Sequence, residues 1–149
     1  MVARVMSNFG LKNLIIVKPR DNWFNIKSTN AAKKAKTILK NVKVYNNLND
    51  ALKNFTYVIS TTNRKRYLNK NSTTEFKFFN KQINSNKKIA IIFGPENSGL
   101  SNEDLRLTDL IFTIETNNKN KSLNLSHAVT VICYKIFESN NIKNNKNIK

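Results

Sequence analysis

Short apolar runs alternate along the chain with stretches in which apolar residues recur at helical spacing. The runs at residues 14–17, 57–60 and 89–93 are uninterrupted and rich in branched residues, which is typical of buried strands. The run at 89–93 is the most apolar of the three. Residues 42–45 and 110–114 predict two further strands, and the polar stretch 67–74 predicts a loop.

The segments between these runs predict helices. One helix ends near Phe9, with Gly10 as its C-terminal cap, and another runs from Ser28 through Leu39. A short helix covers 48–53 and is capped by Asn47 or Asn49, and another covers 76–83. Ser101 is the N-cap of a helix whose first turn is acidic. The apolar face of a last helix consists of Leu125, Ala128, Val129, Ile132 and Ile136.

Alternation of strands and helices predicts an α/β fold, with a mostly parallel sheet and helices on both faces. We expect one domain over residues 1–139. Residues 140–149 contain Asn, Lys and Ile without a period and predict a basic, disordered tail. In such sheets, ligands bind at the carboxyl ends of the strands.

The net charge of the chain predicts a class of binding partner. The chain of 149 residues has a formal net charge of +17 and 40% hydrophobic residues, enough for a real core. A polyanion such as a nucleic acid is the expected partner. The alternative is a solvated basic surface, because enrichment in Lys, Asn and Ile can also reflect an AT-rich genome.

Several classes are excluded by what the chain contains. No apolar run is long enough to span a membrane, and the first residues lack the apolar block of a signal peptide. Cys133 is the single cysteine, so neither an intramolecular disulfide nor a cysteine zinc cluster is expected. No metal site is predicted, and the expected compartment is the cytoplasm.

Three polar segments follow predicted strands, at residues 61–63, 94–99 and 122–124. In the second, Gly94 and Gly99 permit close approach to the backbone. The segment is neither a Walker loop nor GxGxxG, and Glu96 would repel an anion. A ligand-lined pocket and a plain strand-to-helix turn both fit.

Single residues leave similar alternatives. Ser122 or Asn124 fits either a helix cap or a ligand contact. His127 fits a general base less well than a surface position, since no partner can be assigned to it. Cys133 fits a small core residue better than a reactive thiol.

Arginine is scarce in this lysine-rich chain. Arg4, Arg64 and Arg66 therefore suggest bidentate recognition of phosphate or carboxylate, with ordinary surface pairing as the alternative. The stretch Arg64, Lys65 and Arg66 follows a predicted strand, a suitable place to bind an RNA backbone.

Three segments resemble the motifs of SpoU-type RNA 2′-O-ribose methyltransferases of the SPOUT superfamily. They are ARVMSNFG at 3–10, IFGPENSGLSNE at 92–103 and SLNLSHAV at 122–129. Their spacing and the STTNR stretch at 60–64 are most similar to the TrmJ branch, which methylates tRNA at nucleotide 32.

The resemblance implies a C-terminal trefoil knot, a homodimer and an RNA substrate, with tRNA favoured. It also implies an S-adenosylmethionine pocket lined by Thr61, Thr62, Asn63, Gly94, Gly99, Leu100, Ile114, Ser122 and Leu123. Arg4, Glu96, Ser122 and Asn124 are placed by it at the reacting end, and Arg64, Lys65 and Arg66 on the RNA.

Family members usually begin with a strand and an Asn-containing turn before the arginine of the first motif. Here Arg4 stands close to Met1, so this N-terminal strand is expected to be missing. The alternatives to a tRNA methyltransferase are a weak or inactive RNA-binding remnant, an rRNA 2′-O-methyltransferase and a basic ribosome-associated protein without cofactor.

Overall fold

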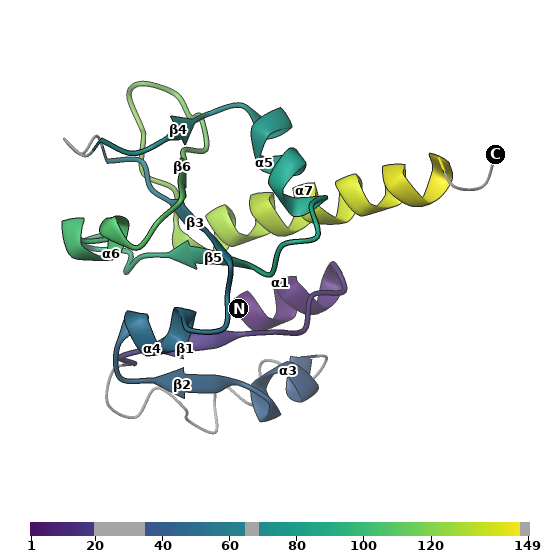
Figure 1. The fold of residues 1–149 in the computed structure, drawn as a ribbon, viewed down its shortest axis with the longest axis horizontal. Coiled ribbons are helices and arrows are strands. Elements are labelled where there is room, and N and C mark those ends of the chain that lie inside the picture. Colours follow the sequence, from purple (N-terminus) through teal and green to yellow (C-terminus); the bar gives the residue numbers. More distant parts are fainter. Residues whose placement is uncertain (20–34, 65–68, 147–149) are drawn as a thin grey trace. The chain divides into compact units, whose positions relative to one another are not determined.

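The structure is a computed structural model that describes residues 1–19, 35–64 and 69–146. The chain divides into two compact units, Met1–Lys53 and Asn54–Lys149, both shown in Figure 1. Each unit is described by itself. No helix among the described residues is long and apolar enough to cross a membrane.

The described part of the first unit contains two short parallel strands, with one helix before them, one between them and one after them along the chain. Its elements are α1 (Val2–Asn8), β1 (Ile15–Val17), α3 (Lys36–Lys40), β2 (Lys43–Tyr45) and α4 (Leu48–Leu52). Strand β1 pairs in parallel with β2, as expected for strands joined through a helical crossover. Only the end of the helix predicted from Ser28 is seen, as α3, because residues 20–34 lie outside the described part.

Two predicted caps in this unit are confirmed. Gly10 has φ +72° and ends α1 in a Schellman motif, in which the Leu11 N–H donates to Met6 O at 2.9 Å. At the start of α4, Asn47 Oδ1 accepts a hydrogen bond from the Asp50 N–H at 2.8 Å. This bond satisfies a helix N–H that has no intrahelical partner.

The second unit contains a four-stranded parallel sheet. Its elements are β3 (Tyr57–Thr61), β4 (Ser72–Thr73), α5 (Phe76–Ile83), β5 (Ile89–Phe93), α6 (Asn102–Arg106), β6 (Leu110–Phe112) and α7 (Leu125–Lys146). The strand order is β4-β6-β3-β5. All pairings are parallel, so the predicted α/β class with a mostly parallel sheet is confirmed.

Helices cover both faces of this sheet, as predicted. Ile111 and Phe112 are neighbours on β6, so their side chains point to opposite faces. On one face Phe112 stacks against Phe79 of α5, with ring centroids 5.1 Å apart. On the other, Ile111 packs with Leu105 of α6. Phe79, Phe112 and Leu105 are fully buried.

Polar groups also fix the register within the sheet. The hydroxyls of Ser60 and Thr108 are buried and hydrogen-bonded to each other. Asp109 Oδ2 accepts from the Val58 N–H at 2.8 Å. Burial raises the pKa of Tyr57, and the negative charge of Asp109 raises it further by a smaller amount. The buried hydroxyls of Ser60 and Thr108 are therefore paired with each other, as most buried polar groups are.

Two predictions about the polar parts of the chain are wrong. Ser72 and Thr73 were expected in a loop but form β4 at the edge of the sheet, because backbone pairing with β6 needs no apolar side chains. Residues 140–146 were expected to be disordered but continue α7, whose last turns Figure 1 shows extending past the sheet. Here Lys143 Nζ donates to Asn84 O at 3.2 Å, which ties the extension to the end of α5.

Strand burial is also lower than predicted in two places. β1 and β5 are half-buried along their whole length, whereas uninterrupted apolar runs predict full burial. β5 is an edge strand of the four-stranded sheet, with β3 as its one neighbouring strand within the described part of this unit.

Candidate functional site

A pocket of about 140 Å³ lies in the second unit, where β3, β5 and β6 end and α7 begins. All three polar segments identified in the sequence contribute to it. The pocket is lined by residues 61–64, 93–96, 99, 114, 121–123, 125 and 128. This is the carboxyl edge of a parallel sheet, where ligands bind in open α/β folds.

The loop after β5 folds back on itself. The Gly99 N–H donates to Pro95 O at 2.8 Å, and Gly99 has φ +67°, a conformation that glycine adopts without strain. A Cβ at position 94 would overlap the backbone of Gly99 and Leu100. The backbone conformation of this loop therefore requires glycine at both positions. This favours a loop of one defined conformation over a plain turn that other residues could form.

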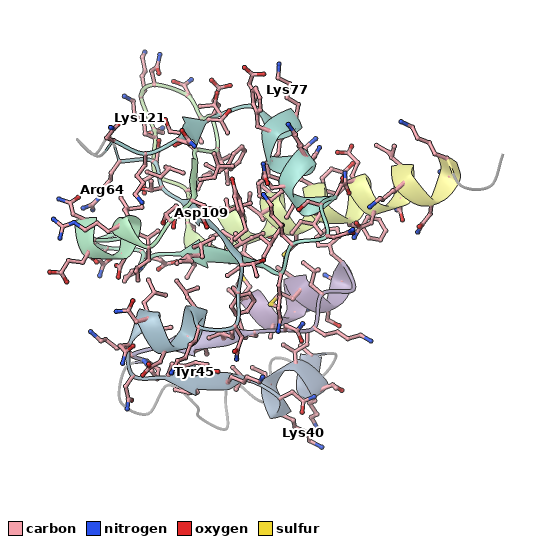
Figure 2. All side chains as sticks on the ribbon, viewed as in Figure 1. Lys40, Tyr45, Arg64, Lys77, Asp109 and Lys121 are labelled. Carbon is pink, nitrogen blue, oxygen red and sulfur yellow. The ribbon has the colours of Figure 1, made fainter. Side chains whose placement is uncertain are left out.

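Two side-chain hydrogen bonds tie this loop to its neighbours. Glu96 Oε1 accepts from the Leu125 N–H, in the first turn of α7, at 3.2 Å. Arg64 Nη2, beyond the end of β3, donates to Asn97 O at 3.0 Å. The three strand-end segments are thus connected to one another through polar contacts. Figure 2 shows Arg64 and Lys121 on the same side of this unit.

The start of α7 is capped by a side chain predicted for that role. Asn124 Oδ1 accepts from the Ser126 N–H at 2.9 Å and from the Ser126 hydroxyl at 2.7 Å. Capping by Asn124 is therefore confirmed, whereas Ser122 lies in the stretch that lines the pocket. Leu125 and Ala128, from the first turns of the helix, complete that wall.

The lining combines apolar side chains with neutral polar groups and three charged residues, Arg64, Glu96 and Lys121. Phe93, Ile114 and Leu123 provide the apolar part. The Thr61 hydroxyl donates to Ile92 O at 2.9 Å and shapes the wall from within the sheet. The exposed Glu96 carboxylate disfavours a phosphate beside it. Such a site suits a ligand that has an apolar part and polar groups, with a cationic centre placed on the Glu96 side of the pocket.

Comparison with known families decides the relationship. The model of the SpoU rRNA Methylase family matches residues 1–134. The chain belongs to the SpoU methylase family. The resemblance predicted from three short motifs therefore extends over most of the sequence.

Individual SpoU relatives match most of this chain. The tRNA (cytidine-2′-O-)-methyltransferase TrmJ of Methanocaldococcus jannaschii is 37% identical over 139 residues, which cover 91% of this chain and 60% of that relative. The crystal structure of TrmJ from Z. mobilis ZM4 has a TM-score of 0.85 and 34% identity, covering 93% of this chain and 62% of that one. The chain thus spans about 60% of the length of the relatives it matches.

A more distant neighbour supports the SpoU fold alone. The SpoU methyltransferase AviRb from Streptomyces viridochromogenes, solved in complex with AdoMet, has a TM-score of 0.69 at 15% identity. The match covers 93% of this chain and 54% of AviRb.

The structure brings together most residues predicted to hold the cofactor of a SpoU enzyme. The pocket includes Thr61, Thr62, Asn63, Gly94, Gly99, Ile114, Ser122 and Leu123. Leu100 is not among the lining residues, and its side chain is buried against Leu105 and Ile111. The resemblance implies contact largely through backbone groups, so a cofactor contact of the Leu100 backbone stays a prediction. The helix cap of α6 follows immediately, and this turn directs Leu100 into the core.

The residues predicted at the reacting end lie in three different parts of the structure. Glu96 and Ser122 line the pocket, while Asn124 caps α7 just outside the lining. Arg4 is exposed on α1, in the first unit. Arg64 lines the pocket, in addition to the RNA-binding role predicted for it, and Lys65 and Arg66 lie outside the described residues.

Some lining residues were missed from the sequence. Phe93 and Pro95 stand inside the glycine motif, and their position there was the available signal. Leu125 and Ala128 were assigned only to the apolar face of α7, because periodicity does not distinguish a core contact from a pocket wall. Lys121 had no signal beyond its place next to Ser122.

The single histidine and cysteine lie outside the pocket lining. His127 is exposed on α7, as the surface interpretation predicted. Cys133 is buried, and burial raises the pKa of its thiol to about 11, so the core interpretation holds. Among the residues that the structure describes, no group of three or more His, Cys, Asp or Glu side chains could hold a metal ion.

Proposed function

We propose that this chain carries the methyl-transfer site of an S-adenosylmethionine-dependent RNA 2′-O-ribose methyltransferase that acts on tRNA. The observation that carries the proposal is the pocket itself. Residues of two SpoU motifs, at 92–103 and 122–129, and the strand-end segment 61–64 line a single pocket at one sheet edge.

The donor set of the pocket fits this cofactor. Apolar side chains such as Phe93 and Ile114 suit an adenine ring, and the backbone groups around Gly94 and Gly99 suit its polar edges. The cofactor has no phosphates, so no Walker lysine is needed. When bound, it supplies an electrophilic methyl group on a sulfonium, a positive centre that tolerates the Glu96 carboxylate nearby.

The chain's own residues then act on the RNA. We propose that Arg4 orients the target ribose and its adjacent phosphate and stabilises the negative charge that develops on the 2′-oxygen. A guanidinium stays protonated in proteins, so it is poorly suited to remove the proton itself. Ser122 and Asn124 would hydrogen-bond around the reacting hydroxyl.

Several finer features are proposed with this function. They are a trefoil knot that holds the pocket, a homodimer, a cytoplasmic location, and nucleotide 32 of the anticodon loop as the target. The TrmJ relative from Methanocaldococcus jannaschii, a tRNA (cytidine-2′-O-)-methyltransferase, supports the choice of tRNA. Arg64, Lys65 and Arg66 are the proposed RNA contacts, and the net charge of +17 favours association with any RNA.

The test is methyl transfer by the purified chain. Labelled S-adenosylmethionine is mixed with unmodified tRNA and, separately, with unmodified rRNA, and modified nucleosides are mapped by mass spectrometry. A 2′-O-methylated nucleoside in tRNA supports the proposal. Methylation of rRNA alone overturns the tRNA assignment. Cofactor binding without any transfer identifies an inactive remnant, and the absence of cofactor binding overturns the methyltransferase assignment.

A further inference from the structure

Arg64 was predicted to contact RNA, but its side chain lies against the pocket loop. Nη2 donates to Asn97 O at 3.0 Å. Its Nε is 3.6 Å from the point where a Cβ on Gly99 would stand. The guanidinium therefore bonds to the tip of the loop and lies beside Gly99 at its exit, more than thirty residues further along the chain.

Among the residues that the structure describes, few other contacts hold this loop in shape. Residues 95–98 are exposed, and exposed loops with few buried apolar contacts open readily. Their internal hydrogen bond runs from the Gly99 N–H to Pro95 O. Glu96 anchors one side of the loop to α7, and Arg64 anchors the opposite side to the segment after β3.

We propose that Arg64 is a positioning residue for the cofactor pocket, which holds the 95–99 loop in its binding conformation through Asn97 O. This inference rests on the proposed function, because it takes S-adenosylmethionine as the ligand. Pro95, Glu96 and Gly99 all line the pocket, so a loop released at Asn97 presents a less ordered wall. Binding must then order it, which lowers affinity.

The RNA contact and the loop anchor proposed for Arg64 make different predictions, which are measured separately. A phosphate contact affects RNA affinity and its salt dependence, with a change of about one in the slope of log K against log salt. A loop anchor affects cofactor affinity and leaves that slope unchanged. A charged donor to a carbonyl makes a stronger hydrogen bond than a neutral one, and its loss predicts about 5- to 10-fold weaker cofactor binding.

The experiment compares Arg64→Met, which keeps the aliphatic stem but loses the donors, with Arg64→Lys, which keeps a charged donor. Arg106→Ala is the matched control, because it removes an arginine from the last turn of α6, outside the pocket lining. Calorimetry measures S-adenosylmethionine affinity, and salt-dependent binding assays measure RNA affinity. We expect weaker cofactor binding in Arg64→Met, partial recovery in Arg64→Lys, and wild-type cofactor affinity in Arg106→Ala.

Unchanged cofactor affinity in Arg64→Met overturns the proposal. If the slope of log K for RNA binding against log salt is reduced in that variant, Arg64 is assigned to RNA binding instead. Hydrogen exchange of the cofactor-free protein provides a test that does not depend on the proposed function. The Gly99 amide should exchange faster in Arg64→Met than in the wild type or in Arg106→Ala. Equal exchange overturns the proposal. Failure of the wild type to bind S-adenosylmethionine refutes the proposed function separately.

Discussion

Glu96 Oε1 accepts a hydrogen bond from the backbone N–H of Leu125 at 3.2 Å. The bond joins the loop after β5 to the first turn of α7, across 29 positions of the chain. A helix N-terminus carries unsatisfied N–H groups and a partial positive charge, and both favour a carboxylate. Glu96 therefore has a structural role in addition to its proposed place at the reacting end.

Substitution of Glu96 separates these two roles. Glu96→Ala removes the acceptor and should lower the free energy of unfolding by about 0.5–1 kcal/mol, as for other helix caps. Glu96→Gln keeps a carbonyl oxygen and should retain most of that stability. Both variants lose the negative charge, so both should transfer methyl groups more slowly. Urea unfolding and initial rates measure the two effects.

The outcome for Glu96→Gln is decisive. Wild-type rates in this variant would show that the charge has no part in catalysis and that Glu96 acts as a cap alone. Stability as low as that of Glu96→Ala would instead show that the carboxylate, and not merely an acceptor, holds α7.

Gly94 should be intolerant of a methyl group. A Cβ at this position overlaps the Leu100 nitrogen and the Gly99 backbone, so Gly94→Ala must displace the loop, at a cost of about 1–3 kcal/mol. S-adenosylmethionine affinity should fall as well, because the displaced atoms belong to the pocket wall. Calorimetry and thermal unfolding test both consequences.

Gly10→Ala is the matched control for Gly94→Ala. Gly10 has φ +72°, but a Cβ there meets nothing within 4 Å, so only backbone strain of about 1 kcal/mol is expected. Cofactor affinity should stay at the wild-type value. Equal loss of binding in both variants would contradict the local explanation for Gly94.

The meeting of three separate segments at one site could be predicted from the sequence, because parallel strands have their carboxyl ends at the same edge of the sheet. Predicted strands precede residues 61–63, 94–99 and 122–124. This order along the chain was sufficient to predict that the three segments lie at one edge of the sheet. The glycine motif also indicated where the backbone turns sharply. These features depend on local pattern and on general rules of topology.

Other features depend on contacts that no local pattern contains. The bond from Arg64 to Asn97 requires the exact path of two loops. The packing of the Leu100 side chain against Leu105 and Ile111 depends on the turn at the start of α6. β4 is polar and forms through backbone pairing with β6. The extension of α7 through 140–146 is tied to the end of α5, where Lys143 Nζ donates to Asn84 O at 3.2 Å.

The Cys133 thiol should be unreactive in the folded protein. Its ionisation should make the free energy of unfolding depend on pH in the alkaline range. Burial raises the pKa of its thiol from 9.0 to about 11, so the folded protein disfavours the thiolate. The stabilisation from the neutral thiol is complete below about pH 9 and is lost as the pH rises toward 11. Wild type should therefore lose more stability than Cys133→Ala over this range, as measured by urea unfolding at successive pH values.

A thiol reagent gives an independent check on Cys133. At pH 8 the native protein should react much more slowly than the protein unfolded in urea, since the thiolate is the reactive form. Rapid reaction of the native protein would contradict a core position. A steeper pH dependence in Cys133→Ala than in wild type would contradict the direction of the pKa shift.

Arg4 provides the sharpest test of the proposed chemistry. It is exposed on α1, so Arg4→Ala should fold normally, and the pocket lining in the second unit does not include it. If Arg4 orients the ribose and stabilises the developing oxyanion, its loss should reduce methyl transfer by about 100-fold or more, the scale of one lost oxyanion donor. Cofactor affinity should change little. Arg4→Lys keeps the charge but not the bidentate geometry, and should recover only part of the rate. An Arg4→Ala protein that methylates RNA at the wild-type rate would refute the assignment, because no other residue is proposed to stabilise that charge.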